Sequence, residues 1–200
     1  IVNHFQDDTK MAFKKILPYF LTSILVVCFW RIWTSTDNYA FSPVGKEILM
    51  LDIALTSIFI YKSIFWLIFA NAIVFAIRQM IRKQYKVVII CSFLLIGFYI
   101  FIGRIVDKKC AFHYYSVFIN QSTMEGLLTK PISEAGYYIG PILTEKIENK
   151  EMKNRIYAMC GLEIIKYKPS TKTLKKILFD KSEKEEYRAT AFEVLTSFDT

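Results

Sequence analysis

Three apolar segments limit this chain more than any other feature of its sequence. They run from Ile16 to Trp33, from Ile48 to Ile77 and from Val87 to Gly103. A helix of about 20 apolar residues crosses the hydrocarbon core of a bilayer, which is about 30 Å thick. A soluble domain of 200 residues has no need of three such segments. The sequence therefore predicts an integral membrane protein whose apolar segments are helices.

The second segment is too long for one straight crossing. Its thirty residues contain only Asp52 and Lys62 as charged residues and no Gly or Pro. As one helix rising 1.5 Å per residue it would reach about 45 Å, well beyond the hydrocarbon core. Two short spans with a turn near residues 61–63 are one solution. A single crossing with an interfacial or protruding extension is the other.

Cations on either side of the segments decide between these two solutions. Short loops rich in Lys and Arg stay in the cytoplasm. One group of cations precedes the first segment, and another lies between the second and third segments. A single crossing of the second segment puts both groups on the cytoplasmic side. We therefore expect spans at about 16–33, 62–77 and 87–103, with residues 43–61 as the helix extension that begins near Ser42-Pro43. The cations that set this topology are Lys14, Lys15, Arg78, Arg82, Lys83 and Lys86.

This topology predicts a cytoplasmic N-terminus and an extracytoplasmic C-terminal half. The net charge of +8 divides into +5 for residues 1–103, from 10 cations and 5 anions, and +3 for residues 104–200, from 16 and 13. The basic excess thus lies mostly in the membrane domain, where it is a topology signal, and we expect no nucleic-acid partner. The abundance of Ile, Lys, Phe and Tyr indicates an AT-rich genome and favours a bacterial source, so the membrane we expect is a bacterial inner membrane.

The C-terminal half contains a repeat with a shift of 33 residues. The segment from Asn154 to Ile165 aligns with the segment from Tyr187 to Phe198. Apolar residues at helical spacing precede both segments, at 139–143 and at 174–178. The aligned positions are Arg155 with Arg188, Ala158 with Ala191, and Leu162 with Leu195.

Two helix pairs with an Arg and a small Ala early in each second helix resemble HEAT-like repeats. The resemblance covers about residues 137–200 and implies an α-helical, protein-binding domain, with residues 104–136 as a connector. Arrays of this kind normally need at least three repeats to bury a continuous core. The domain therefore needs a cap, from residues 105–135, from the membrane helices or from a partner. The fold class we expect is an all-α membrane protein with three transmembrane helices and a small HEAT-like domain.

The aromatic run from Phe112 to Asn120 lies in the connector. It is rich in residues that favour β-strands. We expect it to form a short strand or a collar at the membrane surface.

Polar residues inside the apolar segments are the candidate functional residues. Asp52 and Lys62 are interpreted as interfacial residues, with an ion pathway as the alternative. Asn71 lies in the middle of the second span, where an amide usually bonds to a neighbouring helix. Ala72 and Ala76 offer a small-xxx-small surface for close helix packing.

Signals of enzyme chemistry are absent from the sequence. His4 and His113 are far apart, and no C-x-x-C pair, Walker loop, Rossmann fingerprint or G-x-S-x-G motif occurs. We expect no catalytic residue, metal or cofactor. Cys110 and Cys160 are free thiols or, in an oxidising compartment, a disulfide.

Three functions are compatible with these features. The first is a membrane-anchored interaction or scaffold protein, in contact with lipid and with other subunits of a larger membrane complex. The second is an immunity-type protein that protects its cell from a membrane-targeting toxin. The third is a transporter or channel component that uses Asp52, Lys62 and Asn71.

Overall fold

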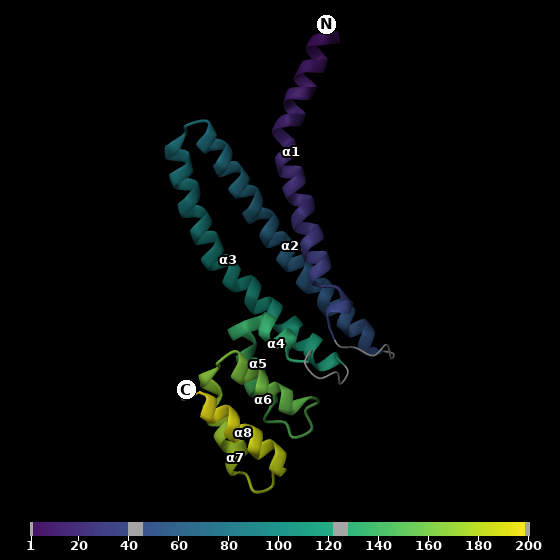
Figure 1. Ribbon diagram of the computed structural model, residues 1–200, viewed down its shortest axis with the longest axis vertical. Helices are drawn as coiled ribbons and strands as arrows, with labels where there is room; N and C mark the ends of the chain where they lie inside the picture. Colours follow the sequence, from purple (N-terminus) through teal and green to yellow (C-terminus); the bar gives the residue numbers. More distant parts are fainter. Residues whose placement is uncertain (1, 40–45, 122–127, 199–200) are drawn as a thin grey trace. The chain divides into compact units, whose positions relative to one another are not determined.

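The computed structural model describes residues 2–39, 46–121 and 128–198 of the chain (Figure 1), and over these residues it is helical and contains no strand. The long helices are α1 (Val2–Trp33), α2 (Lys46–Ile81) and α3 (Tyr85–Asn120). The shorter ones are α4 (Lys130–Ala135), α5 (Gly140–Lys146), α6 (Arg155–Ile164), α7 (Thr171–Phe179) and α8 (Glu185–Ser197), with 3-10 turns η1 (Thr36–Asn38), η2 (Gly136–Ile139) and η3 (Lys168–Ser170).

Among these residues, three helices are long and apolar enough to cross a membrane: Phe13–Trp33, Glu47–Ile81 and Tyr85–Asn120. The prediction of an all-helical chain with three long apolar helices is confirmed at this level. The second apolar segment is one unbroken helix, because α2 continues through residues 61–63 without a turn. The predicted start of that helix at Ser42-Pro43 lies outside the described residues.

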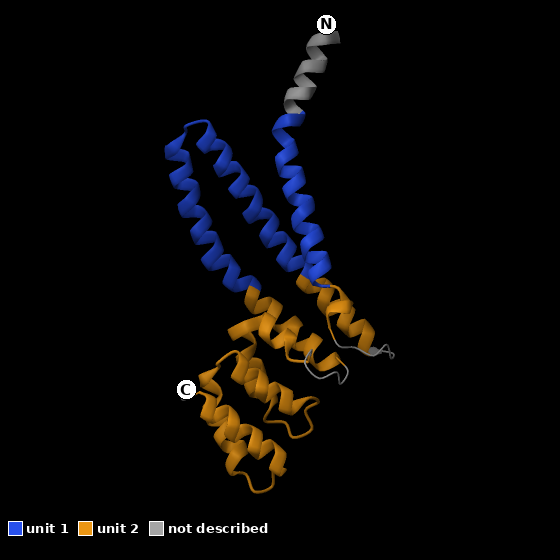
Figure 2. Ribbon diagram, in the orientation of Figure 1, with its two compact units in different colours: residues 1–34, 59–106 blue, residues 35–58, 107–200 orange. Residues whose placement is uncertain are grey.

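The chain divides into two compact units, which Figure 2 colours separately. Unit 1 contains residues 1–34 and 59–106, and unit 2 contains residues 35–58 and 107–200. Helices α2 and α3 each contribute one part to each unit. Unit 2 is thus larger than the helical domain expected at 137–200, since it also takes in residues 46–58 and much of the expected connector.

Unit 1 is held together by aromatic side chains between α2 and α3. The ring of Phe65 stacks on that of Phe98, with centroids 5.2 Å apart, and lies close to Gly103. The two helices run in opposite directions because a tight turn joins them at residues 82–84 (Figure 1). That turn requires one residue in the left-handed region, and Lys83 adopts it with φ 60°.

Unit 2 buries one face of α2 and one face of α3. The buried residues of α2 have helical spacing, at Leu51, Ala54, Leu55 and Ile58. Those of α3 do as well, at Cys110, Ala111, Tyr114, Val117 and Phe118. Of the two predictions for residues 112–120, the strand is therefore wrong, because burial of one helical face outweighs the β-propensity of the individual residues, and the collar at a membrane surface stays a prediction.

The rest of unit 2 consists of helix pairs. Helix α5 packs against α6, α7 packs against α8, and α6 lies in contact with both α4 and α8. Two glycines permit close approach between these elements. A Cβ at Gly161 in α6 would stand 2.4 Å from Cδ1 of Ile132 in α4, and one at Gly140 would stand 2.3 Å from the ring of Tyr167.

Gly140→Ala is expected to destabilise the helix pairs of unit 2 by about 1–3 kcal/mol. The new methyl group would meet the Tyr167 ring, which is itself confined by the Tyr137 ring at a centroid distance of 4.8 Å. Hydrogen exchange of the α5 and α6 amides in the purified full chain measures this change. Gly97→Ala is the matched control, because no atom lies within 4 Å of its Cβ position, and it should leave that exchange unaltered.

Candidate functional site

Asn71 joins α2 to α1 within unit 1. Its amide nitrogen donates hydrogen bonds to the backbone oxygen of Leu67 at 2.8 Å and to the hydroxyl oxygen of Ser23 at 3.1 Å. Ala72 and Ala76 follow on the same helix and are half-buried. The predicted polar and small residues of the second span therefore lie on a helix that is bonded to its neighbour.

Two further polar residues of α2 were not predicted as functional residues. Ser63 and Gln79 are buried, and they stand eight residues before and after Asn71. Within the described residues, Oγ of Ser63, Oδ1 of Asn71 and Oε1 of Gln79 have no hydrogen-bond partner. Each interval of eight residues corresponds to a rise of about 12 Å along the helix. Such atoms commonly bind ordered water or a donor from another helix.

Three cationic side chains of unit 1 lie over aromatic rings, two near one end of the unit and one near the other. At one end, Lys62 lies 5.8 Å from the ring centroid of Trp30, and Arg31 lies 5.9 Å from that of Phe59. At the other end, the Arg78 guanidinium donates to the backbone oxygen of Lys15. The N-terminal part of α1 and the C-terminal end of α2 therefore meet.

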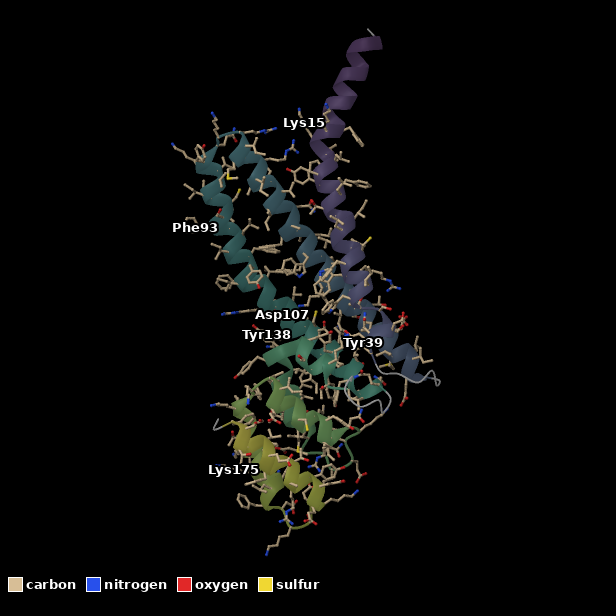
Figure 3. The ribbon with its side chains drawn as sticks, in the orientation of Figure 1. Lys15, Tyr39, Phe93, Asp107, Tyr138 and Lys175 are labelled. Atoms are coloured by element: carbon tan, nitrogen blue, oxygen red, sulfur yellow. The ribbon has the colours of Figure 1, made fainter. Side chains whose placement is uncertain are left out.

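The topology cations gather at this second end of unit 1. Lys15 is labelled there in Figure 3, and Arg78 also lies over the Tyr19 ring at 5.4 Å. The turn after α2 brings the remaining basic residues to the same end, because it begins directly after Ile81. Of these topology cations, Arg78 is half-buried. The exposed ones are Lys14, Lys15, Arg82, Lys83 and Lys86.

In unit 2, Tyr39 ties the loop after α1 to helix α4. Its hydroxyl donates to Oε2 of Glu134 at 2.6 Å, and Lys130 lies 5.2 Å from its ring centroid (Figure 3). Lys130 also donates to the backbone oxygen of Asn38 at 3.0 Å. Burial and the neighbouring Glu134 charge raise the pKa of Tyr39 far above its usual value, so the phenol stays protonated. Asp52, on the α2 part of this unit, is exposed.

Arg155 forms the most buried charged cluster of unit 2. Its two terminal nitrogens each donate to one carboxylate oxygen of Glu183 at 2.9 Å, and its Nε donates to the backbone oxygen of Ile147 at 2.7 Å. The guanidinium also lies 4.9 Å from the ring centroid of Tyr187. The side chains of Arg155 and Glu183 are only 1% and 5% exposed. One side chain thus fastens the end of α5 and the start of α8 to α6.

Surrounding groups keep the Glu183 carboxylate charged. The hydrogen bonds from Arg155 lower the pKa of Glu183 below its usual 4.5, although burial opposes them. Lys150 lies 3.7 Å from the same carboxylate and 2.9 Å from that of Asp180. Hydrogen bonds from Ser182 and Lys150 likewise lower the pKa of Asp180. The loops before α6 and α8 are therefore joined by charged hydrogen bonds.

The residues related by the 33-residue shift occupy similar positions. Nε of Arg188 donates to the backbone oxygen of Leu178 at 3.2 Å, as Nε of Arg155 donates to that of Ile147. In both cases the acceptor lies at the end of the first helix of the pair. Ala158 and Ala191 are both completely buried. The aligned residues differ in burial at other positions: Arg155 and Leu162 are buried, whereas Arg188 and Leu195 are half-buried.

The groups available for metal or redox chemistry are scattered. Over the part of the chain that the structure describes, no three His, Cys, Asp or Glu side chains form a group that could hold a metal. Cys110 is buried and Cys160 half-buried, and no disulfide joins them. The clusters of unit 2 fasten helices to one another.

Glu183→Gln is expected to destabilise the helix pairs of unit 2 by about 3 kcal/mol at pH 7, because it leaves the Arg155 charge buried without its partner. Since the pKa of Glu183 is lower in the folded protein, its stabilisation is complete above about pH 4.5 and is lost as the pH falls through the folded value. Hydrogen exchange of α6 and α8 as a function of pH should show this loss, and Glu183→Gln should abolish it. Glu186→Gln, at an exposed carboxylate of α8, is the control. An unchanged acid response in Glu183→Gln would contradict the assignment.

Comparison with known proteins gives no match: no family model, no curated protein and no solved structure is significantly similar to this chain. The function proposed below therefore depends on the chain's own residues.

Proposed function

We propose that this chain is a membrane-anchored interaction protein, a subunit or accessory of a larger membrane complex, that acts by binding and not by catalysis. Unit 1 would be the anchor, and the helix pairs of unit 2 would be the binding domain. The observation that carries the proposal is the joining of three long apolar helices to a set of packed helix pairs in one chain. Stacked helix pairs offer an extended surface suited to a protein partner.

Lipid is the medium that the surface of unit 1 suits best. Its helices expose large apolar side chains such as Leu25, which is 70% exposed, and Phe93, which is 73% exposed (Figure 3). Apolar surface on this scale is unfavourable in water and favourable in a bilayer core. Proposed spans at about 16–33, 62–77 and 87–103 would bury these side chains.

The cations of unit 1 support a cytoplasmic N-terminus, and the membrane that we propose is the inner membrane of a bacterium. Lys14, Lys15 and the four cations from Arg78 to Lys86 lie at one end of the unit, and that end would be cytoplasmic by the positive-inside rule. Three crossings would then bring unit 2 to the extracytoplasmic side.

The helix pairs of unit 2 would form a HEAT-like domain. The equivalent bonds of Arg155 and Arg188 to the end of each first helix support this proposal, as does the burial of Ala158 and Ala191. Helix α4, packed against α6, would be the cap at one end of the array.

Cysteine labelling tests the topology. Cys110 itself is buried and unsuitable, so Lys175→Cys and Lys83→Cys are introduced separately into a chain whose four cysteines are replaced. Both positions are exposed. A membrane-impermeant maleimide added to intact spheroplasts should label the cysteine at 175, and should label that at 83 only after permeabilisation. The reverse pattern would put unit 2 in the cytoplasm.

Native mass measurement tests the binding function. The full chain, extracted in a mild detergent or in lipid nanodiscs from the cells that produce it, should run as a complex with other chains at defined stoichiometry. Glu183→Gln should reduce the bound fraction, since it weakens the binding domain but leaves unit 1 unchanged. A homogeneous monomer under the same conditions would contradict the proposal.

A further inference from the structure

Helix α8 has an open face where α6 has a covered one. The face of α6 formed by Arg155, Met159 and Leu162 is buried, and Met159 is 0% exposed. The residues 33 positions later are Arg188, Phe192 and Leu195, which we term the end face. Phe192 is 56% exposed, and Arg188 and Leu195 are half-buried. Both sets have spacing i, i+4, i+7, which places each set on one side of its helix.

The covered face of α6 is directed toward α8. Its Arg155 pairs with Glu183, just before α8, and lies over the ring of Tyr187 in the first turns of α8. Another side of α6 meets α4, because Gly161 lies against Ile132. Val194, 33 positions after Gly161, is also buried, and α8 packs against α6. Helix α6 thus contacts α4 on one side and α8 on another. Helix α8 contacts α6 on the corresponding first side, and the end face is its corresponding second side. Among the described residues of unit 2, no further helix covers the end face.

The guanidinium of Arg188 indicates the chemistry of whatever covers the end face. Its Nε is used in the same way as that of Arg155, for the carbonyl at the end of the first helix. The terminal nitrogens of Arg155 bind the carboxylate of the next layer. Within the described residues no carboxylate pairs with Arg188. A bidentate bond from its two terminal nitrogens to an incoming carboxylate would give Arg188 the same pairing that Arg155 has.

We propose that the end face docks an α-helical hairpin of a partner protein, with an Asp or Glu in the hairpin loop that pairs with Arg188 and a helix that covers Phe192 and Leu195. The docked hairpin would repeat the way in which α8 covers α6, with Glu183 of the loop between α7 and α8 paired with Arg155. This inference rests on the proposed binding function and specifies the site and the partner's chemistry.

A second copy of the chain is a poorer occupant than a different protein. Head-to-tail stacking of copies requires an open layer at the opposite end of the array. That end is occupied within unit 2, where Ile132 of α4 lies against Gly161 and Glu134 of α4 accepts the Tyr39 hydroxyl. The end face therefore favours a chain with a different sequence.

Site-specific photo-crosslinking tests the proposal on the full chain in the cells that produce it. A benzophenone amino acid replaces Phe192, and in a control chain it replaces Glu193, which is exposed and points about 100° away around the helix. Irradiation should join position 192, and not position 193, to another protein. Sequencing of the joined peptide should find a helical hairpin with a carboxylate in its loop. Adding Arg188→Gln should lower the adduct yield at least about tenfold, the ratio that corresponds to 1.4 kcal/mol of binding free energy.

Other products would overturn the proposal. A partner hairpin at the end face is excluded if position 192 crosslinks to a second copy or to lipid, or if it forms no adduct. It is also excluded if position 192 forms a protein adduct whose yield Arg188→Gln leaves unchanged. Because Arg188→Gln also removes the bond to Leu178, Phe192→Ser is the second variant: the residue is exposed, so hydrogen exchange of α7 and α8 should stay as in the wild type. A native complex that survives Phe192→Ser at full yield would reject the end face as the docking site and leave the binding function standing, whereas a monomeric wild-type chain would reject both.

Discussion

The helix pairs of unit 2 depend on one buried cation. Arg155 donates to Ile147 at the end of α5, to both carboxylate oxygens of Glu183 and, through its guanidinium face, contacts Tyr187 of α8. A buried guanidinium is tolerated only when its donors and its charge are satisfied. Arg155 links the two helix pairs and must keep its bonds to Ile147 and Glu183. This requirement fixes the position of α8 on α6. The Arg188 end face is a consequence, because the same arginine position recurs where the described chain supplies no carboxylate.

Unit 1 obeys a different constraint. Its helices expose apolar side chains outward and keep their few polar groups inside, at Ser63, Asn71 and Gln79. One amide hydrogen bond from Asn71 to Ser23 and the Arg78 bond to Lys15 link α1 to α2. In a bilayer, packing and a few such bonds must hold helices together, since the hydrophobic effect does not favour helix contact over lipid contact. In a bilayer, unit 1 would therefore be held together by packing and a few polar bonds, whereas buried charged hydrogen bonds join the helix pairs of unit 2.

Several features could be predicted because they depend on local pattern. The three apolar helices follow from segment length, the unbroken α2 from the cations on either side of it, and the helices at 140–146 and 171–179 from apolar spacing. Others could not. The run at 112–120 has β-forming residues, and only the burial of Tyr114, Val117 and Phe118 on one side decides for helix. The spacing of Cys110 and Cys160 left open a disulfide between them, and only the structure places Cys110 inside the core of unit 2 as a free thiol. Leu195 aligns with Leu162 in the sequence, yet Leu162 is buried by its neighbours and Leu195 is half-buried.

The sequence by itself determined which segments are apolar, at which end of unit 1 the cations gather and which residues recur after 33 positions, because these properties belong to residue type and spacing. Only the tertiary structure decided what those residues touch. It paired Arg155 with Glu183, which lies 28 residues away, drew residues 46–58 and 107–120 into the unit of the helix pairs, and left Phe192 exposed. Contacts between distant residues depend on how faces of helices meet. A periodic pattern indicates that a face is apolar, but it does not identify the surface that covers it.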